Sequence, residues 1–435
     1  MYLPRNIDAK LKKWASSRYR KPLILRGARQ VGKSASVAQL GALFPFFLVV
    51  DFEHQDFKAV FEQDLDPKRI IKQLEVILGQ RIIPKETLLF FDEVQECPRA
   101  LMSLRYFQEQ LPELHVIAAG SLLEFVLGSL SFPVGRVEYE YLYPLSFQEF
   151  LKWTGQEILA ENLPEFNGDV LPHIDNMVAQ KLNEALREYF IVGGMPEAVK
   201  VYAETSSFIE VRRIQDNLIQ SFQDDIPKYV RGASQIRNII KVFKRLAGSC
   251  CQQVTYSKLL DDDNKRNKQS VFLLEKAMLI HLVRATSPNG LPLGAHCSEK
   301  VFKPLFLDIG IAQRISGRQE EQIVQANDLV SMFQGQLAEQ FVGQQMLAEK
   351  KGCENGKMYY WKRHKRGSTA EVDYIMSRNG EIVPVEVKSG KAGRLKSLHL
   401  LMREYPHIKV GLCMQSINQP SVHENIYFLP LYTKV

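Results

Sequence analysis

The sequence has few of the features that mark secreted or zinc-stabilised proteins. Only six of its 435 residues are cysteine, and no two of them form a Cys-x-x-Cys pair. Adjacent cysteines such as Cys250 and Cys251 have poor geometry for a structural disulfide. We therefore expect free thiols in a reducing compartment and no structural zinc. The six positions are Cys97, Cys250, Cys251, Cys297, Cys353 and Cys413.

Long apolar segments are also absent. Residues 1–5 contain no apolar stretch of the kind that forms the centre of a signal peptide. No uninterrupted apolar run approaches the length of a bilayer span. We therefore expect a cytosolic protein without a membrane partner.

The sequence has little excess of either charge. Its 56 Lys and Arg residues outnumber 49 Asp and Glu residues, which gives a formal net charge of +7. This mild excess allows DNA or RNA as a partner without requiring one. Apolar residues make up 45% of the chain and charged residues 24%, as in ordinary globular proteins. At this length two to three domains are expected.

One stretch near the start of the chain predicts a phosphate-binding loop. Residues 22–34 read Pro-Leu-Ile-Leu-Arg-Gly-Ala-Arg-Gln-Val-Gly-Lys-Ser. An apolar strand runs into the pattern Gly-x-x-x-x-Gly-Lys-Ser, and a helical stretch follows, which is the context that this motif requires. The alternative is a glycine-containing loop that binds nothing.

The residue types in this loop suit a nucleoside triphosphate. Gly27 and Gly32 permit positive φ angles and a close approach of the backbone to phosphate at a helix N-terminus. Lys33 is expected to reach the β- and γ-phosphates, and Ser34 to ligate Mg²⁺. The predicted ATP-binding residues of the loop are Gly27, Ala28, Arg29, Gln30, Val31, Gly32, Lys33 and Ser34.

A second buried strand supplies the acids that such a site needs. Residues 46–53 form an apolar strand that ends in acids, and residues 67–80 have helical periodicity. Residues 88–91, Leu-Leu-Phe-Phe, then precede Asp92 and Glu93. We expect Asp92 to hold the Mg²⁺ water shell and Glu93 to polarise the attacking water.

Two further residues are candidates for nucleotide contact. Ser121 follows a predicted strand at residues 115–119, where it could contact the γ-phosphate or simply cap the next helix. Arg136 precedes an alternating strand pattern and could contact nucleotide in the same subunit or a neighbouring one; the alternative is a solvated charge.

Alternation of strands and helices over residues 20–150 predicts a parallel sheet with helices on both faces. Residues 1–150 are therefore the predicted ATPase domain. Residues 151–230 are predicted to be helical, with a turn at Gly193-Gly194-Met195-Pro196.

Residues 231–300 have the element pattern of a small winged helix. Helices are expected at residues 236–248 and 270–279, a short helix is expected to start at residues 254–260, and a hairpin runs through residues 282–290. The second long helix is very apolar, which favours a structural module over a DNA-reading one.

The last segment, residues 301–435, contains a second set of chemically informative residues. Asp373 lies in a predicted strand, and Glu386 and Lys388 lie on one face of the next, after the Asn379-Gly380 turn. Two carboxylates that hold Mg²⁺ or Mn²⁺, with a lysine that orients water, suit metal-assisted phosphodiester cleavage. The alternative is a solvated β-meander.

The surroundings of this second site are basic. Residues 357–396 contain ten Lys or Arg residues and four Asp or Glu residues, a local charge that suits a phosphate backbone. The ten basic positions are 357, 362, 363, 365, 366, 378, 388, 391, 394 and 396.

Over nearly its full length the chain resembles the prokaryotic AAA-type ATPases that have a C-terminal domain of unknown function (DUF4143). The matching stretches are residues 27–34, 88–95, 120–123, 135–137, 143–150, 193–199 and 305–310.

The resemblance implies an ATPase core, a helical lid, a winged-helix element and a C-terminal α/β fold like the PD-(D/E)XK restriction endonucleases. On that basis Asp373, Glu386 and Lys388 match the nuclease motif, and Glu339 matches its helix glutamate. Val372 stands where the motif usually has proline. Gly194-Met195-Pro196 resembles the Gly-x-Pro motif of signal-transduction (STAND-type) ATPases, in which Pro196 would lie near the base.

Two hypotheses follow from these residues. In the first, ATP binding and hydrolysis control a metal-dependent nuclease in which Asp373, Glu386 and Glu339 bind the metal. In the second, ATP controls a switch or scaffold whose nuclease-like domain only binds a partner. The sequence is compatible with an oligomer in either case.

Overall fold

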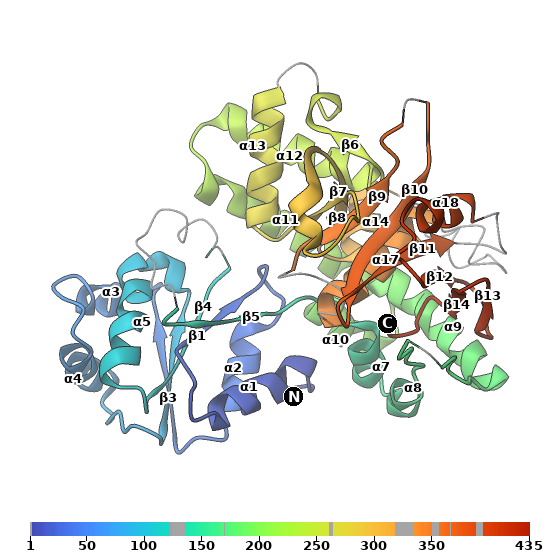
Figure 1. Ribbon diagram of the computed structural model, residues 1–435. Helices are drawn as coiled ribbons and strands as arrows, with labels where there is room; N and C mark the ends of the chain where they lie inside the picture. The colour runs from blue at the N-terminus through green and yellow to red at the C-terminus, as the bar shows by residue number, and fades with distance from the viewer. Residues whose placement is uncertain are drawn as a thin grey trace. The chain divides into compact units, whose positions relative to one another are not determined.

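The computed structural model describes residues 2–121, 123, 135–168, 170–260, 264–317, 335–349, 356–365, 367–388 and 395–435 (Figure 1). The chain divides into two compact units, Met1–Tyr143 and Pro144–Val435. Several positions named above lie outside the described ranges: Leu122, Cys353, Arg366, Lys391 and Arg394.

The first unit contains the predicted parallel sheet, which is confirmed. Its strand order is β2-β3-β4-β1-β5, and every neighbouring pair is parallel. β4 therefore lies between β1 and β3, so the ends of these three strands meet at one edge. The strands are β1 (Leu23–Arg26), β2 (Phe46–Asp51), β3 (Thr87–Asp92), β4 (His115–Ala119) and β5 (Glu138–Tyr141).

Helices cover both faces of this sheet. Alternate residues of each strand point to opposite faces. Val50, Phe91 and Val116 pack in one apolar core with residues from α4 and α5. On the other face, Phe47 packs beside Gly41 of α2. The helices are α1 (Asn6–Ser16), α2 (Lys33–Gly41), α3 (Gln55–Val60), α4 (Pro67–Leu78) and α5 (Pro98–Gln110), with a 3₁₀ turn η1 (Val94–Glu96).

The second unit is built on a mixed sheet of nine strands, with the order β13-β14-β12-β11-β10-β9-β7-β8-β6. β9, β10 and β11 form an antiparallel meander, and β11, β12 and β14 are parallel to one another. The strands are β6 (Val254–Thr255), β7 (Ile280–Thr286), β8 (Cys297–Phe306), β9 (Met358–Lys362), β10 (Glu371–Arg378), β11 (Glu381–Lys388), β12 (Gly411–Gln415), β13 (Ser421–His423) and β14 (Ile426–Pro430).

The start of the second unit is helical, as the sequence predicts, and further helices flank the sheet. No helix in the described part of the chain is both long enough and apolar enough to cross a bilayer. The helices are α7 (Phe147–Trp153), α8 (Glu157–Glu161), α9 (Asn176–Val192), α10 (Pro196–Thr205), α11 (Phe208–Tyr229), α12 (Ala233–Gly248), α13 (Asn264–Lys276), α14 (Ile309–Ser316), α17 (Gly335–Glu349) and α18 (Lys396–Glu404), with 3₁₀ turns η2 (Tyr256–Lys258) and η3 (Leu293–His296).

The region predicted as a winged helix differs from expectation in two respects. Val254 and Thr255 form β6 instead of starting a helix, because they pair with Phe302 and Val301 of β8. The β7–β8 hairpin also does not stand alone, since β7 pairs in parallel with β9. Residues 254–306 and 358–430 therefore contribute strands to one continuous sheet, and the predicted boundary at residue 300 falls inside β8.

Candidate functional site

The loop at residues 27–32 connects β1 to α2 in a conformation that depends on glycine. Gly32, which precedes α2, has a φ of 95°. A Cβ atom on Gly27 would lie 2.4 Å from the carbonyl oxygen of Leu142, so no larger residue fits there without a backbone shift. The closely packed loop therefore leads directly into the N-terminus of α2, whose first N–H groups have no partners within the helix.

Arg5 supports this loop, a role that the sequence analysis missed. Its guanidinium is buried and donates to the carbonyl oxygens of Val31, at 3.1 Å, and Tyr143, at 2.8 Å. Only its position at the start of a basic helix was visible in the sequence, and long-range pairing of this kind leaves no local pattern.

Lys33 is the most deeply buried charged side chain of the loop. Its ammonium group donates to the carbonyl oxygens of Gly27, at 3.0 Å, and Ala28, at 2.8 Å. Burial lowers the pKa of Lys33 to about 8, although the negative charges of Glu93 and Asp92 act in the opposite direction. Because both acceptors are neutral carbonyls, an anionic ligand would relieve the cost of burying this charge.

Ser34 and Asp92 meet at the same edge of the sheet. The Ser34 hydroxyl donates to Asp92 Oδ2 at 2.8 Å. Burial raises the pKa of Asp92, and the hydrogen bond from Ser34 opposes this. A hydroxyl and a carboxylate oxygen side by side are hard ligands of the type that Mg²⁺ prefers, so these two residues fit the predicted cation.

Glu93 has an unusual backbone conformation. Its φ of 47° and ψ of 41° lie in the left-handed region, which residues other than glycine seldom adopt. Gln95 donates from Nε2 to Glu93 Oε2, and a Cβ atom on Gly120 would lie 2.1 Å from Gln95 Oε1. Gln95 thus connects Glu93 to the end of β4. It appears in the sequence analysis only within the matching stretch 88–95.

Ser121 and Arg136 differ in their surroundings. Ser121 is buried and follows β4, next to the strand ends that hold the loop and the acid pair. Arg136 instead forms an ion pair with Glu109, with Nε and Oε1 3.1 Å apart and both side chains partly exposed. This contact is what the solvated-charge alternative predicts, and a role for Arg136 at the nucleotide stays a prediction.

The Gly193-Gly194-Met195-Pro196 turn lies in the second unit, where Pro196 begins α10. The Gly194 N–H donates to Asp308 Oδ2 at 2.6 Å. A Cβ atom on Gly310 would lie 2.8 Å from the Val192 carbonyl oxygen, so the turn and the stretch 305–310 interlock. Residues 193–199 and residues 305–310, which are two separate stretches of the family resemblance, therefore form one structural feature.

A buried polar network extends from this turn to α17. Gln344 Nε2 donates to Asp308 Oδ2 at 3.1 Å and to the Tyr189 hydroxyl at 3.0 Å. Tyr189 donates in turn to the Leu145 carbonyl at 2.6 Å. Burial raises the pKa of Asp308, and the hydrogen bond from the Gly194 N–H opposes this. A buried carboxyl with this many partners fixes the surrounding elements in one arrangement.

The predicted acids of the second site lie together on β10 and β11. The register between β10 and β9 shifts between Val372 and Ile375, so Asp373 lies at a bulge. Its Oδ2 accepts a hydrogen bond from the Val387 N–H at 2.8 Å, which brings it beside Glu386. Bulges of this kind redirect side chains next to functional sites.

Glu386 and Lys388 form an ion pair within β11, from Lys388 Nζ to Glu386 Oε1. Burial and the charge of Asp373 raise the pKa of Glu386 to about 7. Among the described residues, the second carboxylate oxygen of Glu386 is buried without a hydrogen-bond partner. The sequence analysis placed Glu386 and Lys388 on one face of a strand, and in the structure the two side chains form an ion pair.

Lys303 of β8 occupies the centre of this acidic site, and the sequence analysis missed it. Its ammonium lies 2.8 Å from Glu339 Oε1, 2.5 Å from Glu371 Oε1 and 3.1 Å from Asp373 Oδ1. Burial alone would lower the pKa of Lys303, but these carboxylates raise it well above its usual value. The available signal was a lysine within the otherwise apolar run 301–307.

A basic groove lies beside α18. It has a volume of about 850 Å³ and its lining contains no acid. Arg363 of the lining donates to Glu404, which is not a lining residue, while Lys396 and Arg403 are exposed. The lining residues are Arg363, Leu395, Lys396, His399, Leu400 and Arg403.

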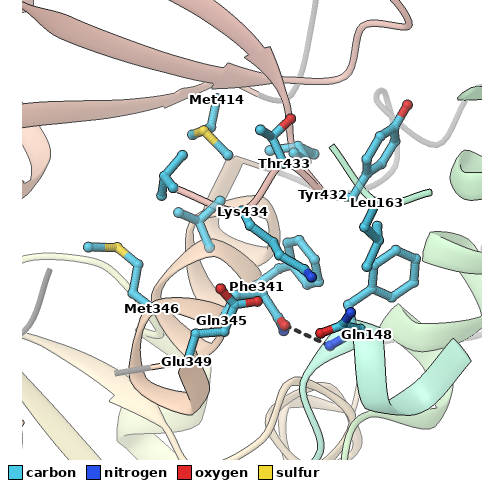
Figure 2. Close-up of a pocket in the computed structure, with 14 residues that line it drawn as sticks. Gln148, Leu163, Phe341, Gln345, Met346, Glu349, Met414, Tyr432, Thr433 and Lys434 are labelled. Atoms are coloured by element: carbon cyan, nitrogen blue, oxygen red, sulfur yellow. Dashed lines mark hydrogen bonds between the residues drawn. The ribbon is translucent and has the colours of Figure 1, made fainter. Parts of the chain in front are cut away.

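Another pocket, between α7, α17 and residues 431–435, contains none of the predicted site residues (Figure 2). Its side chains are mainly apolar, and Gln345 Oε1 accepts a hydrogen bond from the Phe147 N–H at 2.7 Å. The enclosed volume of about 20 Å³ holds roughly one water molecule, which is too small for a substrate.

The backbone strain at Glu93 leads to a stability prediction. Both Glu93→Gly and Glu93→Ala remove the carboxylate, but only glycine adopts positive φ without a Cβ clash. We expect the glycine variant to be the more stable by about 1 kcal/mol, measured by hydrogen exchange of β3 and β4 amides. Glu96, which lies nearby without a positive φ, is the matched control, and there the alanine variant should be the more stable. Equal stability of the two Glu93 variants would contradict the assignment of strain.

Three family models match successive parts of the chain. Residues 19–151 match an AAA domain, residues 183–322 a domain of unknown function (DUF8612) and residues 334–433 a domain of unknown function (DUF4143). The N-terminal part of the chain is thus similar to AAA domains, and the C-terminal part is similar to DUF4143 domains. Among curated proteins, none matches the sequence.

Several solved structures align with much of the chain at low similarity. The Walker-type ATPase of Pyrococcus abyssi is 17% identical, with 72% of this chain and 96% of that chain aligned at a TM-score of 0.44. The Aeropyrum pernix ORC1 protein in complex with DNA is 14% identical, with 72% and 93% aligned at 0.30. AMPPCP-bound DnaA from Aquifex aeolicus is 12% identical, with 62% and 86% aligned at 0.26. Similarities this low carry no argument about function.

Proposed function

We propose that the protein binds and hydrolyses ATP and that its nucleotide state controls the C-terminal domain. The observation that carries the proposal is the meeting of three features at adjacent strand ends. These are the loop with the buried Lys33 after β1, the acids Asp92 and Glu93 at the end of β3, and Ser121 after β4. The AAA-domain match over the same residues supports the assignment.

Each residue in this group has a distinct proposed role. Loop N–H groups and Lys33 bind the β- and γ-phosphates. Ser34 and Asp92 would hold Mg²⁺, which neutralises phosphate charge when bound. Glu93, oriented by Gln95, orients and polarises the attacking water, and Ser121 contacts the γ-phosphate. Arg136 is proposed to contact the nucleotide of the same subunit or of a neighbouring one. By resemblance, Pro196 is proposed to contact the nucleotide from the helical lid.

The C-terminal part of the second unit is proposed to have a nuclease-like fold. The order α17, β9, β10, β11, α18, β12, with an antiparallel meander followed by a parallel strand, supports the resemblance to PD-(D/E)XK enzymes. α12, α13 and the β7–β8 hairpin are proposed as a winged-helix element that packs against it. Val271 and Leu274 of α13 are buried, which favours a structural role for that helix.

Of the two hypotheses for this domain, binding is favoured over cleavage. A metal-dependent nuclease needs Asp373, Glu386 and Glu339 to hold a cation, yet Lys303 already contacts two of these acids. Among the described residues, no group of three His, Cys, Asp or Glu side chains is arranged to hold a metal. The basic groove beside α18 instead offers charges to a nucleic-acid backbone.

ATP hydrolysis is tested by Glu93→Gln. The amide keeps the shape of the side chain but cannot activate water, so we expect ATP to remain bound while hydrolysis slows by about 100-fold or more. Phosphate release and retention of labelled ATP are measured on the same preparation. Glu96→Gln, three residues later on η1, is the control and should hydrolyse at the normal rate. Unchanged phosphate release in Glu93→Gln would remove Glu93 from the mechanism.

The buried Lys33 predicts how ATP affinity depends on pH. In the nucleotide-free protein its pKa is about 8, and bound phosphates must raise it. Above pH 8 the complex therefore binds more protons than the free protein. Affinity should be constant below pH 8 and fall by up to about tenfold per pH unit above it. A fluorescent ATP analogue measures this. The affinity of Lys33→Arg for ATP should not depend on pH in this range, because arginine stays charged. If the affinity of Lys33→Arg varies with pH as that of wild type does, a group other than Lys33 causes the pH dependence.

Binding without cleavage is tested on single- and double-stranded DNA, with Mg²⁺ or Mn²⁺ and with or without ATP. We expect salt-dependent binding, no cleavage, and about tenfold weaker binding in Lys396→Ser/Arg403→Ser because two phosphate contacts are lost. Lys68→Ser, an exposed lysine on α4, is the control. Metal-dependent cleavage that disappears in Lys388→Ala would establish a nuclease instead.

A further inference from the structure

Lys303 stands out as a charged residue in the interior of the second unit. It lies on β8, which pairs with β7 in a hairpin, and the Lys303 side chain is 1% exposed. A lysine is almost never buried this fully unless its charge is compensated. Its partners must therefore account for its position.

Three carboxylates from two elements surround this ammonium group. Glu339 comes from α17, and Glu371 and Asp373 come from β10, with nitrogen–oxygen distances of 2.5 to 3.1 Å. An ammonium group has three N–H donors. All three are thus accounted for by carboxylates, and the Tyr360 ring lies 5.2 Å from the nitrogen on a further side.

The charge of Lys303 is needed to keep these acids together. Glu339 and Asp373 both contact it, and both are buried or largely buried. Without a cation between them, two carboxylates at this separation would repel one another in a region of low dielectric constant. One cation at the centre satisfies this requirement, and here the chain itself supplies it.

A divalent metal would compete with the ammonium groups and the Val387 N–H for most of the acidic oxygen atoms at this site; Glu386 Oε2, which has no hydrogen-bond partner among the described residues, is the exception. Asp373 Oδ1 faces Lys303, while Asp373 Oδ2 accepts the Val387 N–H at 2.8 Å. Glu386 Oε1 faces Lys388. Mg²⁺ requires ligand oxygens near about 2.1 Å in octahedral geometry, which these oxygens cannot provide while they bind ammonium groups.

We propose that the Lys303 ammonium, held by Glu339, Glu371 and Asp373, takes the place of a divalent metal, so that this acidic site is closed to Mg²⁺ and Mn²⁺. The inference rests on the proposed nuclease-like fold and is independent of ATP hydrolysis. The acids are structural partners of an internal cation, and the domain recognises its partner without metal-dependent chemistry. Removal of Lys303 opens the site to a metal.

The test is Mn²⁺ binding to the full-length, nucleotide-free protein, measured by the electron paramagnetic resonance signal of free Mn²⁺. Wild type and Asp373→Asn should bind the same amount of Mn²⁺, because the acidic site around Lys303 binds no Mn²⁺ in either protein. Lys303→Ala should gain one Mn²⁺ that binds about tenfold or more tightly than any Mn²⁺ on wild type. Lys303→Ala/Asp373→Asn should lose it again. Lys300→Ala, an exposed lysine of the same strand, is the matched control and should resemble wild type.

Two results would overturn the proposal. One is Mn²⁺ binding by wild type that Asp373→Asn abolishes, and the other is a folded Lys303→Ala variant that gains no Mn²⁺. If Lys303→Ala does not fold, the comparison of wild type with Asp373→Asn still decides the question. Because no nucleotide is present, failure here is separate from failure of the proposed ATPase, which the Glu93→Gln measurement tests.

Discussion

The cost of burying a charged ammonium group explains both sites of this protein. Lys33 and Lys303 are both almost fully buried, but they have opposite surroundings. Lys33 donates to neutral carbonyls and has a lowered pKa, so its charge remains incompletely compensated until an anion arrives. Lys303 contacts three carboxylates and has a raised pKa, so its charge is compensated from within. The first arrangement favours ligand binding, whereas the second favours a closed structure.

The backbone around Lys33 is organised by close approaches that only glycine allows. Gly27 lies against the Leu142 carbonyl, and Gly120 lies against Gln95, which donates to Glu93. Glu93 itself has positive φ, a conformation that costs about 1 kcal/mol or more and persists only where neighbours impose it. The strand order that brings β4 between β1 and β3 thus determines where the carboxylate of Glu93 lies. Strain and close packing at these strand ends are what place an acid beside a phosphate loop.

Local sequence patterns were sufficient for the strands of the first unit and for some of the contacts that depend on them. The run 88–91 and its terminal acids, for example, correspond to β3 and the Ser34–Asp92 contact. The proximity of two residues on one face of a single strand, such as Glu386 and Lys388, could also be predicted from the sequence. Arg5 and Lys303 were missed because their partners lie far away in the sequence and share no periodic pattern with them. The same reason hid the parallel pairing of β7 with β9, since strand order in a sheet is a tertiary property.

Helix α17 connects the Asp308 network with the carboxylates around Lys303, two of the buried polar clusters in the second unit. Its Gln344 binds Asp308, which holds the Gly194 turn before α10, and its Glu339 binds Lys303. Between them, Gln340 donates to the Phe306 carbonyl and accepts from the Phe306 N–H, so that α17 is tied to β8 at the backbone as well. A displacement of the turn would break at least one buried hydrogen bond unless α17 and β8 moved with it. The proposed control of the C-terminal domain through the helical segment therefore requires these elements to move as one body, with Lys303 kept among its carboxylates.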